Sequence, residues 1–196
     1  MPPTDQLAYS DRFEDAVAFA LAAFRHKRRK ATGIPYAVHL LAVCALVGEH
    51  GGDEDQMIAA VLHDYLEDVP GSTADELRAR FGARVAELVV GLSDTTTHPK
   101  PPWRVRKEGY LARLPAEPPD LKLVCCADKL HNCRSTLLDH QRVGNAVYER
   151  FNAGREGTLW YYRGVVDALG RGWAHRLLDE LHTAVDELHR VTLAAR

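Results

Sequence analysis

The densest group of chemically active side chains in the sequence is the motif HDYLED, which follows the strongly apolar run MIAAVL. His63 and Glu67 are four residues apart, as are Asp64 and Asp68, so a continuous helix would gather all four on one side. One interpretation is a solvated acidic helix end, although carboxylates there oppose the helix dipole. The other is a buried polar cluster, which is costly unless it binds something.

Two further candidate ligands, His39 and Asp128, lie in the apolar stretches YAVHLLAV and LKLVCCADKLHN. Alone, His39 is typical of a core or surface histidine, and Asp128 of a packing carboxylate with an arginine partner. Together with His63 and Asp64 they supply two nitrogen and two oxygen ligands from three amphipathic helices. This donor set suits Mn²⁺, Fe²⁺ or Zn²⁺ better than Ca²⁺, which prefers oxygen ligands. The sequence therefore predicts a metal site.

The order H…HD…D resembles the HD-domain metal-dependent phosphohydrolases. The stretches RRKATGIPYAVHLLAV, IAAVLHDYLEDV, FGARVAELVVGLSD and LVCCADKLHN are similar to the hydrolase domain of Rel/Spo-type alarmone enzymes, and especially to the stand-alone small alarmone hydrolases. The similarity extends from about residue 12 to about residue 170. We expect no synthetase domain in this chain.

The resemblance implies a Mn²⁺-dependent 3′-pyrophosphohydrolase that removes pyrophosphate from (p)ppGpp or (p)ppApp, with Fe²⁺ or Zn²⁺ as alternative metals. The implied metal ligands are His39, His63, Asp64 and Asp128. Glu67 and Asp68 are the implied acidic pair that positions or deprotonates the attacking water. A bound divalent ion and a neighbouring carboxylate suit that chemistry.

A polyanionic substrate also needs cationic and polar contacts. The substrate-binding residues that the resemblance implies are Arg29, Lys30, Lys100, Lys107, Asn132, Arg155 and Tyr161. Solvated helix faces are the alternative for the basic residues, and core packing is the alternative for Tyr161. His131 is three residues beyond Asp128 and is a further candidate for the site. The loop ATG before Ile34 is one residue longer than the family's usual loop, which leaves base recognition open.

Apolar residues recur every three or four positions along most of the chain, which is typical of amphipathic helices. The predicted helical segments are 11–30, 36–50, 53–69, 72–81, 84–93, 103–114, 120–139, 156–170 and 173–194. Loops are predicted at 94–102 and 115–119, and irregular structure at 140–155. We expect an all-α HD-domain bundle of about eight to ten helices. The domain would span 1–196, with a motif-bearing core at about 12–170 and a last helix at 173–194.

The composition is that of a globular protein: of 196 residues, 46% are hydrophobic and 27% charged, with a net charge of −2. This balance argues against a general nucleic-acid binder, which is usually basic. The sequence has 10 histidines, and most match no motif. The histidines expected at the surface are His26, His50, His98, His140, His175, His182 and His189.

The four cysteines form no CxxC pair, and we expect them to be buried and reduced, as in a cytoplasmic protein. No signal peptide or membrane span is predicted. The expected partner is a small nucleotide, with no nucleic acid and no membrane. The oligomeric state stays open, with a homodimer as one alternative. Two competing functions are an HD phosphohydrolase for a nucleoside 5′-monophosphate or a dNTP, and a non-enzymatic nucleotide sensor.

Overall fold

The computed structural model describes residues 9–30, 32–97 and 99–194. These residues form α-helices and short 3-10 helices, and they include no β-strand, only an isolated bridge between Arg28 and Pro35. The elements are α1 (Asp11–Ala23), α2 (Ala37–Glu49), α3 (Glu54–Leu62), α4 (Tyr65–Asp68), α5 (Ala74–Phe81), α6 (Ala83–Leu92), α7 (Trp103–Arg113), η1 (Leu114–Ala116), α8 (Pro119–Val143), η2 (Gly144–Arg150), α9 (Gly154–Leu169) and α10 (Arg176–Ala194). The all-α prediction is confirmed; the single-domain boundaries stay a prediction. Within the described ranges, no helix combines the length and apolarity needed to cross a membrane.

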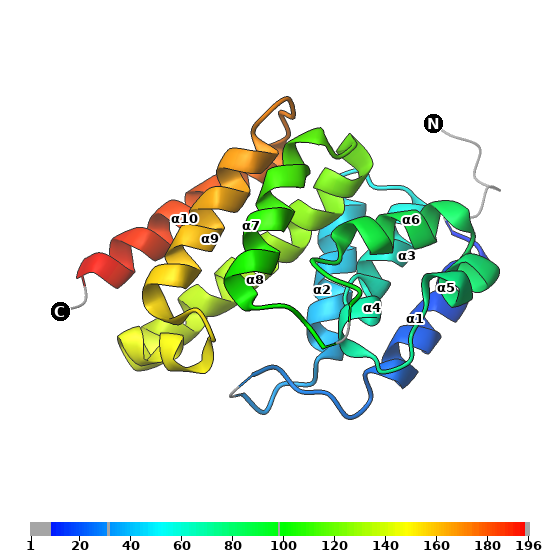
Figure 1. Ribbon diagram of the computed structural model, residues 1–196, viewed down its shortest axis with the longest axis horizontal. Helices are drawn as coiled ribbons and strands as arrows, with labels where there is room; N and C mark the ends of the chain where they lie inside the picture. The colour runs from blue at the N-terminus through cyan, green and yellow to red at the C-terminus, as the bar shows by residue number, and fades with distance from the viewer. Residues whose placement is uncertain (1–8, 31, 98, 195–196) are drawn as a thin grey trace.

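The long helix α8 is the centre of the bundle, because it packs against α2, α3, α6, α9 and α10. Figure 1 shows α1, α3, α5 and α6 on one side of α2 and α8, and α9 and α10 on the other. The N-terminal part of α8 is wholly buried from Leu121 to Asp128. The carboxylate of Asp128 is therefore held in the interior by the packing of its helix.

Local sequence signals explain where several helices begin. Asp53 accepts a hydrogen bond from the Gln56 backbone, and the Gln56 side chain accepts one from the Asp53 backbone, which forms a capping box before α3. Thr73 caps α5 by accepting from the Glu76 backbone. Gly82 separates α5 from α6 with φ +93°, a value that favours glycine.

The prediction of one continuous helix over residues 53–69 is wrong. The helix α3 ends at Leu62, and α4 begins at Tyr65. At Asp64 the backbone has φ −96° and ψ 2°, in the sparsely populated region where many active-site residues are found. The HDYLED side chains are thus arranged by a turn and not by four-residue helical spacing.

Other boundaries also differ from the prediction. The helix α1 ends at Ala23, and the basic segment after it forms a loop closed by backbone hydrogen bonds from Arg29 to Ile34 and from Tyr36 to Lys27. At the other end of the chain, α8 continues to Val143 and is followed by the 3-10 helix η2. Basic and polar residues favour solvent exposure both in a helix and in a loop. Their presence in the sequence therefore does not show where α1 and α8 end.

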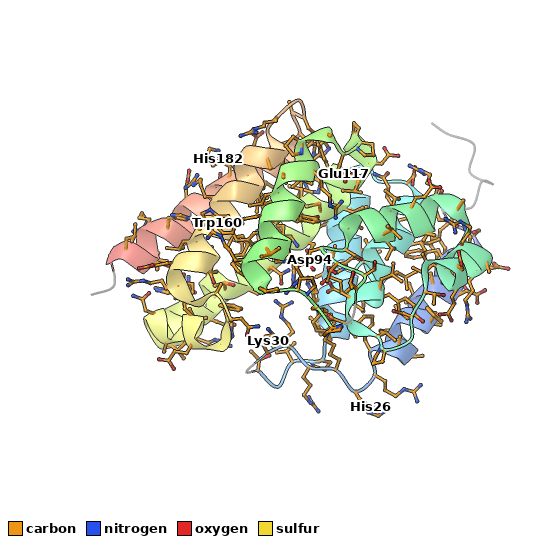
Figure 2. The ribbon with its side chains drawn as sticks, viewed as in Figure 1. His26, Lys30, Asp94, Glu117, Trp160 and His182 are labelled. Carbon is orange, nitrogen blue, oxygen red and sulfur yellow. The ribbon has the colours of Figure 1, made fainter. Side chains whose placement is uncertain are left out.

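The four cysteines are all free and buried, as predicted. His26 and His182 are exposed, as expected (Figure 2). His140 is buried, with a ring nitrogen 3.1 Å from Asn145 Oδ1, so the expectation of a surface position was wrong. It is buried because α8 continues past residue 139 and η2 packs against its end. His98 lies outside the described residues.

Candidate active site

Three buried side chains converge where α2, the α3–α4 turn and α8 meet. His39 Nε2 lies 3.2 Å from His63 Nε2 and 3.2 Å from Asp128 Oδ1, and His63 Nε2 lies 3.6 Å from Asp128 Oδ1. One possible ligand atom from each residue lies within 4.8 Å of the others. These residues, far apart in sequence, therefore form a compact group of metal-binding atoms.

The hydrogen bonds around the two histidines turn their Nε2 atoms toward this group. His63 Nδ1 lies 2.7 Å from the Ala60 carbonyl oxygen, which can only accept, so Nδ1 carries a hydrogen. When a metal ion replaces the proton on Nε2, the ring is neutral and its Nε2 lone pair faces the same point as Asp128 and His39. The Nδ1 atom of His39 lies 2.8 Å from His131 Nδ1. Such outer hydrogen bonds orient metal-ligating histidines, so the donor set fits a divalent cation that accepts nitrogen and oxygen ligands.

Asp64 lies beside this group. Its Oδ2 atom is 3.1 Å from His63 Nε2 and 3.8 Å from His39 Nε2, and it accepts a hydrogen bond from the Tyr36 hydroxyl. Burial lowers the pKa of His39. Burial alone would lower the pKa of His63 too, but Asp64 and Asp128 outweigh it and hold that pKa well above its ordinary value. The two carboxylates thus favour a positive charge between them.

The two candidate catalytic acids have different surroundings. Burial, and then the charges of Asp64 and Asp94, raise the pKa of Glu67 to about 7. Glu67 Oε1 accepts a hydrogen bond of 2.8 Å from the Asp94 backbone. Asp68 is more exposed and forms ion pairs with Lys27 and with Lys100, the latter at 3.3 Å. Glu67 can therefore exchange a proton near neutral pH, whereas Asp68 is a partner for cations.

A cavity of about 500 Å³ opens beside this cluster, a size usual for small-molecule sites. The candidate site residues that line it are Arg29, Lys30, His63, Asp64, Glu67, Asp68, Lys107, Asp128, His131, Asn132 and Tyr161. Figure 2 shows Lys30, on the loop between α1 and α2, and Asp94, after α6, facing the same region. Neither Lys100 nor Arg155 is among the lining residues, and Arg155 is exposed.

Four polar side-chain atoms in the described part of the chain are buried without a hydrogen-bond partner. They are Arg29 Nη1, Asp94 Oδ1, Arg150 Nε and Tyr161 Oη. All four residues line this one cavity. Because buried polar atoms are normally satisfied, their concentration here indicates a place for a polar ligand.

The candidate substrate-binding residues are tied to the metal-binding group. Arg29 Nη2 donates to Asn132 Oδ1 at 2.9 Å, and Asn132 Nδ2 donates to Asp128 Oδ1 at 2.5 Å. Lys107 Nζ lies 2.7 Å from Asp94 Oδ2 and 4.8 Å from the centre of the Tyr161 ring. Lys30 reaches the cavity from an exposed position.

Sequence reasoning missed several residues of the site. Asp94 was predicted to begin a polar loop and was not named as a site residue, yet its side chain is 2% exposed and pairs with Arg106 and Lys107. Lys129, next to Asp128, forms an ion pair with it inside the cavity wall. Arg150 fell in a segment predicted to be irregular. Asp94 and Lys129 carried a sequence signal, because they lie within the stretches FGARVAELVVGLSD and LVCCADKLHN.

The sequence has clear relatives. Residues 16–159 match a family model described as HD domain. Over 123 residues, which are 61% of this chain and 66% of the relative, it is 38% identical to the mouse guanosine-3′,5′-bis(diphosphate) 3′-pyrophosphohydrolase MESH1. It is also 34% identical over 127 residues to the guanosine-3′,5′-bis(diphosphate) 3′-pyrophosphohydrolase of Aquifex aeolicus, covering 65% of this chain and 18% of that protein. The chain thus spans less than two thirds of either relative.

Solved structures have the same fold. A metazoan orthologue of SpoT that hydrolyses ppGpp superposes with a TM-score of 0.73 and 24% identity, over 92% of this chain and 95% of that one. The crystal structure of lmo0812 from Listeria monocytogenes superposes with a TM-score of 0.71 and 27% identity, over 78% of this chain and 99% of that one.

Proposed function

This chain belongs to the HD-domain family, and on that basis we propose that it is a metal-dependent 3′-pyrophosphohydrolase of the alarmone nucleotides (p)ppGpp, (p)ppApp or both. The observation that carries the proposal is the buried His39–His63–Asp128 group beside a cavity containing four unpartnered polar atoms. The names of the mouse and Aquifex aeolicus relatives supply the substrate class, guanosine 3′,5′-bis(diphosphate).

In this proposal the metal is Mn²⁺, held by four side chains. The ligands are His39, His63, Asp64 and Asp128. When bound, a divalent ion lowers the pKa of water and polarises a phosphoryl oxygen. The chain's own contribution is to hold the two Nε2 atoms and the carboxylates together by the Ala60 carbonyl, His131 and the Tyr36 hydroxyl.

Glu67 is proposed as the base that accepts a proton from the attacking water. The Asp94 backbone donates to Oε1, so the proposed accepting atom is Oε2, which lies 3.7 Å from Lys100 Nζ. A pKa of about 7, raised by burial, suits proton transfer at neutral pH. Asp68 is proposed to orient Lys27 and Lys100 at the cavity rim.

The remaining polar side chains are proposed to bind the substrate. Arg29 Nη1 and the Tyr161 hydroxyl are buried and unpartnered, so each can donate to a phosphate or ribose oxygen without losing a contact. Lys107, Lys100, Lys30 and Asn132 complete the proposed set. Arg155 is exposed and does not line the cavity, so it is not included in the proposed set.

We also propose a cytoplasmic location, supported by the four buried and unpaired thiols. Reducing conditions preserve such thiols, whereas oxidising compartments favour disulfides.

The decisive experiment is to incubate the purified protein and Mn²⁺ with ppGpp and, separately, with ppApp, and to measure pyrophosphate release. A nucleoside 5′-monophosphate and a dNTP serve as comparison substrates. We expect release from at least one alarmone, and a loss of kcat of about 100-fold or more in Glu67→Gln. The matched control is Glu108→Gln, an exposed carboxylate paired with Arg104 on α7. Turnover of the comparison substrates alone would refute the proposal.

A further inference from the structure

The cavity does not stop at the metal-binding group but continues along α8. Asp128, Asn132, Ser135, Asp139 and Arg142 line it, and their spacing of four, three, four and three residues places them on one face of the helix. At 1.5 Å per residue, Asp139 lies about 16 Å along the helix from Asp128, and Arg142 about 21 Å. The far end of the cavity is therefore distinct from the metal-binding end.

Arg150 of η2 closes this far end. Its Nη2 atom donates to Asp139 Oδ2 at 2.6 Å, and its guanidinium lies 5.0 Å from the centre of the Phe151 ring. The side chain is 14% exposed, and its Nε is buried with no partner. The guanidinium is thus held in place while one of its donors stays available to a ligand.

The charge at this end is positive. Arg142 lines the cavity from an exposed position and has no ion-pair partner among the described residues. On the lining surface formed by η2 and the stretch of α8 beyond Ser135, Asp139 is the only carboxylate in the described structure. Two guanidinium groups and one carboxylate favour an anion, and the planar guanidinium matches phosphate oxygens in particular.

We propose that Arg150 and Arg142 form a second anion subsite, which binds the 5′-phosphate group of a nucleotide whose 3′-diphosphate lies at the metal-binding end. The inference rests on the proposed alarmone function and specifies its substrate: a nucleotide phosphorylated on both sides of the ribose. Arg150 is anchored on Asp139, about 16 Å along α8 from Asp128, so we assign the anion bound there to a phosphate group other than the one cleaved beside Asp128.

The kinetic test compares ppGpp with guanosine 3′-diphosphate, which lacks the 5′-phosphates. Arg150→Gln should raise KM for ppGpp by about tenfold or more, the effect of losing a charge-assisted hydrogen bond. It should leave KM for guanosine 3′-diphosphate and both kcat values near those of the wild type. Arg134→Gln is the matched control, because Arg134 is an exposed arginine on α8 paired with Glu180 and outside this cavity.

A binding measurement makes the result independent of turnover. Calorimetry with guanosine 5′-diphosphate and with guanosine should show a loss of affinity of about tenfold in Arg150→Gln for the diphosphate only. Equal losses for both ligands would mean that Arg150 contacts the nucleoside, and no loss for either would remove it from the site; both results overturn the inference. If Arg150→Gln fails to fold, Arg142→Gln allows the same comparison of the two ligands, because Arg142 is exposed and has no ion-pair partner among the described residues. If the wild type hydrolyses ppGpp and neither variant changes KM or affinity, the subsite is refuted and the proposed function stands. If the wild type hydrolyses no alarmone, the proposed function itself is refuted.

Discussion

Glu67 and Asp68 are adjacent carboxylates, yet their surroundings give them different chemistry. Glu67 is buried near Asp64 and Asp94, which disfavours its charge. Asp68 lies at the rim among lysines. From the sequence, the two residues are predicted only as an acidic pair. The positions of the neighbouring charges in the structure are what favour Glu67 over Asp68 as the proposed base.

The raised pKa of Glu67 predicts a pH-dependent cost to the folded state. Since burial raises its pKa from 4.5 to about 7, the unfolded chain ionises first as the pH rises through this range, and the free energy of unfolding falls. In Glu67→Gln this decrease is absent, so the variant should gain up to roughly 3 kcal/mol relative to the wild type between pH 4.5 and pH 8.

Urea denaturation at a series of pH values, with a chelator present, measures this difference. The chelator ensures that only the protein's own charges act on Glu67. Glu108→Gln, on the surface, should follow the wild type. A difference between Glu67→Gln and the wild type that does not change with pH would contradict the prediction.

At the scale of elements, short connections determine how the helices meet. The link from α2 to α3 is the sharpest example, because Gly52 packs directly on the end of α2. A Cβ atom at Gly52 would lie 2.4 Å from Val47 Cγ1 and 2.9 Å from the Val47 carbonyl oxygen. The position of α3, and of His63 just after it, depends on this close approach.

Replacing Gly52 by alanine should therefore destabilise the protein by about 1–3 kcal/mol, since a backbone carbonyl cannot move aside without shifting α2. The matched substitution is Gly109→Ala, within α7, where a Cβ atom meets nothing within 4 Å. There alanine should stabilise the protein by about 0.5–1 kcal/mol through its higher helix propensity. Thermal or urea unfolding of both variants checks the pair, and equal effects of the same sign would show that the close contact is unimportant.

At the scale of the whole molecule, the candidate metal ligands join three parts of the bundle: α2, the α3–α4 turn and α8. A cation that binds only the folded arrangement stabilises it by mass action. At a free concentration 100 times its dissociation constant, the gain is about 2.7 kcal/mol. Metal binding should consequently be visible in the stability of the entire protein.

We expect Mn²⁺ to raise the melting temperature of chelator-treated protein and to have little effect on Asp128→Asn, which keeps the side-chain volume but loses the carboxylate. Asp179→Asn, an exposed acid on α10, is the control and should respond as the wild type does. Differential scanning calorimetry with and without Mn²⁺ makes the measurement. An equal shift in Asp128→Asn would exclude Asp128 as a ligand.

Much of this protein could be predicted from residue types and spacing. Helical periodicity indicated the all-α fold, because an amphipathic helix must turn its apolar residues to a core. The motif order indicated His39, His63 and Asp128 as ligands, and the structure brings these three together.

Only the tertiary structure decided how the polar side chains are partnered. Periodicity does not reveal the turn at Asp64. The Asp64 carboxylate accepts a hydrogen bond from the hydroxyl of Tyr36, the residue just before α2, and this contact joins segments 28 residues apart. Nor does periodicity reveal that Asp94 is buried beside Glu67, or that Arg150 lines the cavity opened along α8. Spacing along one chain specifies a helix face, but burial and charge depend on which other segments cover that face.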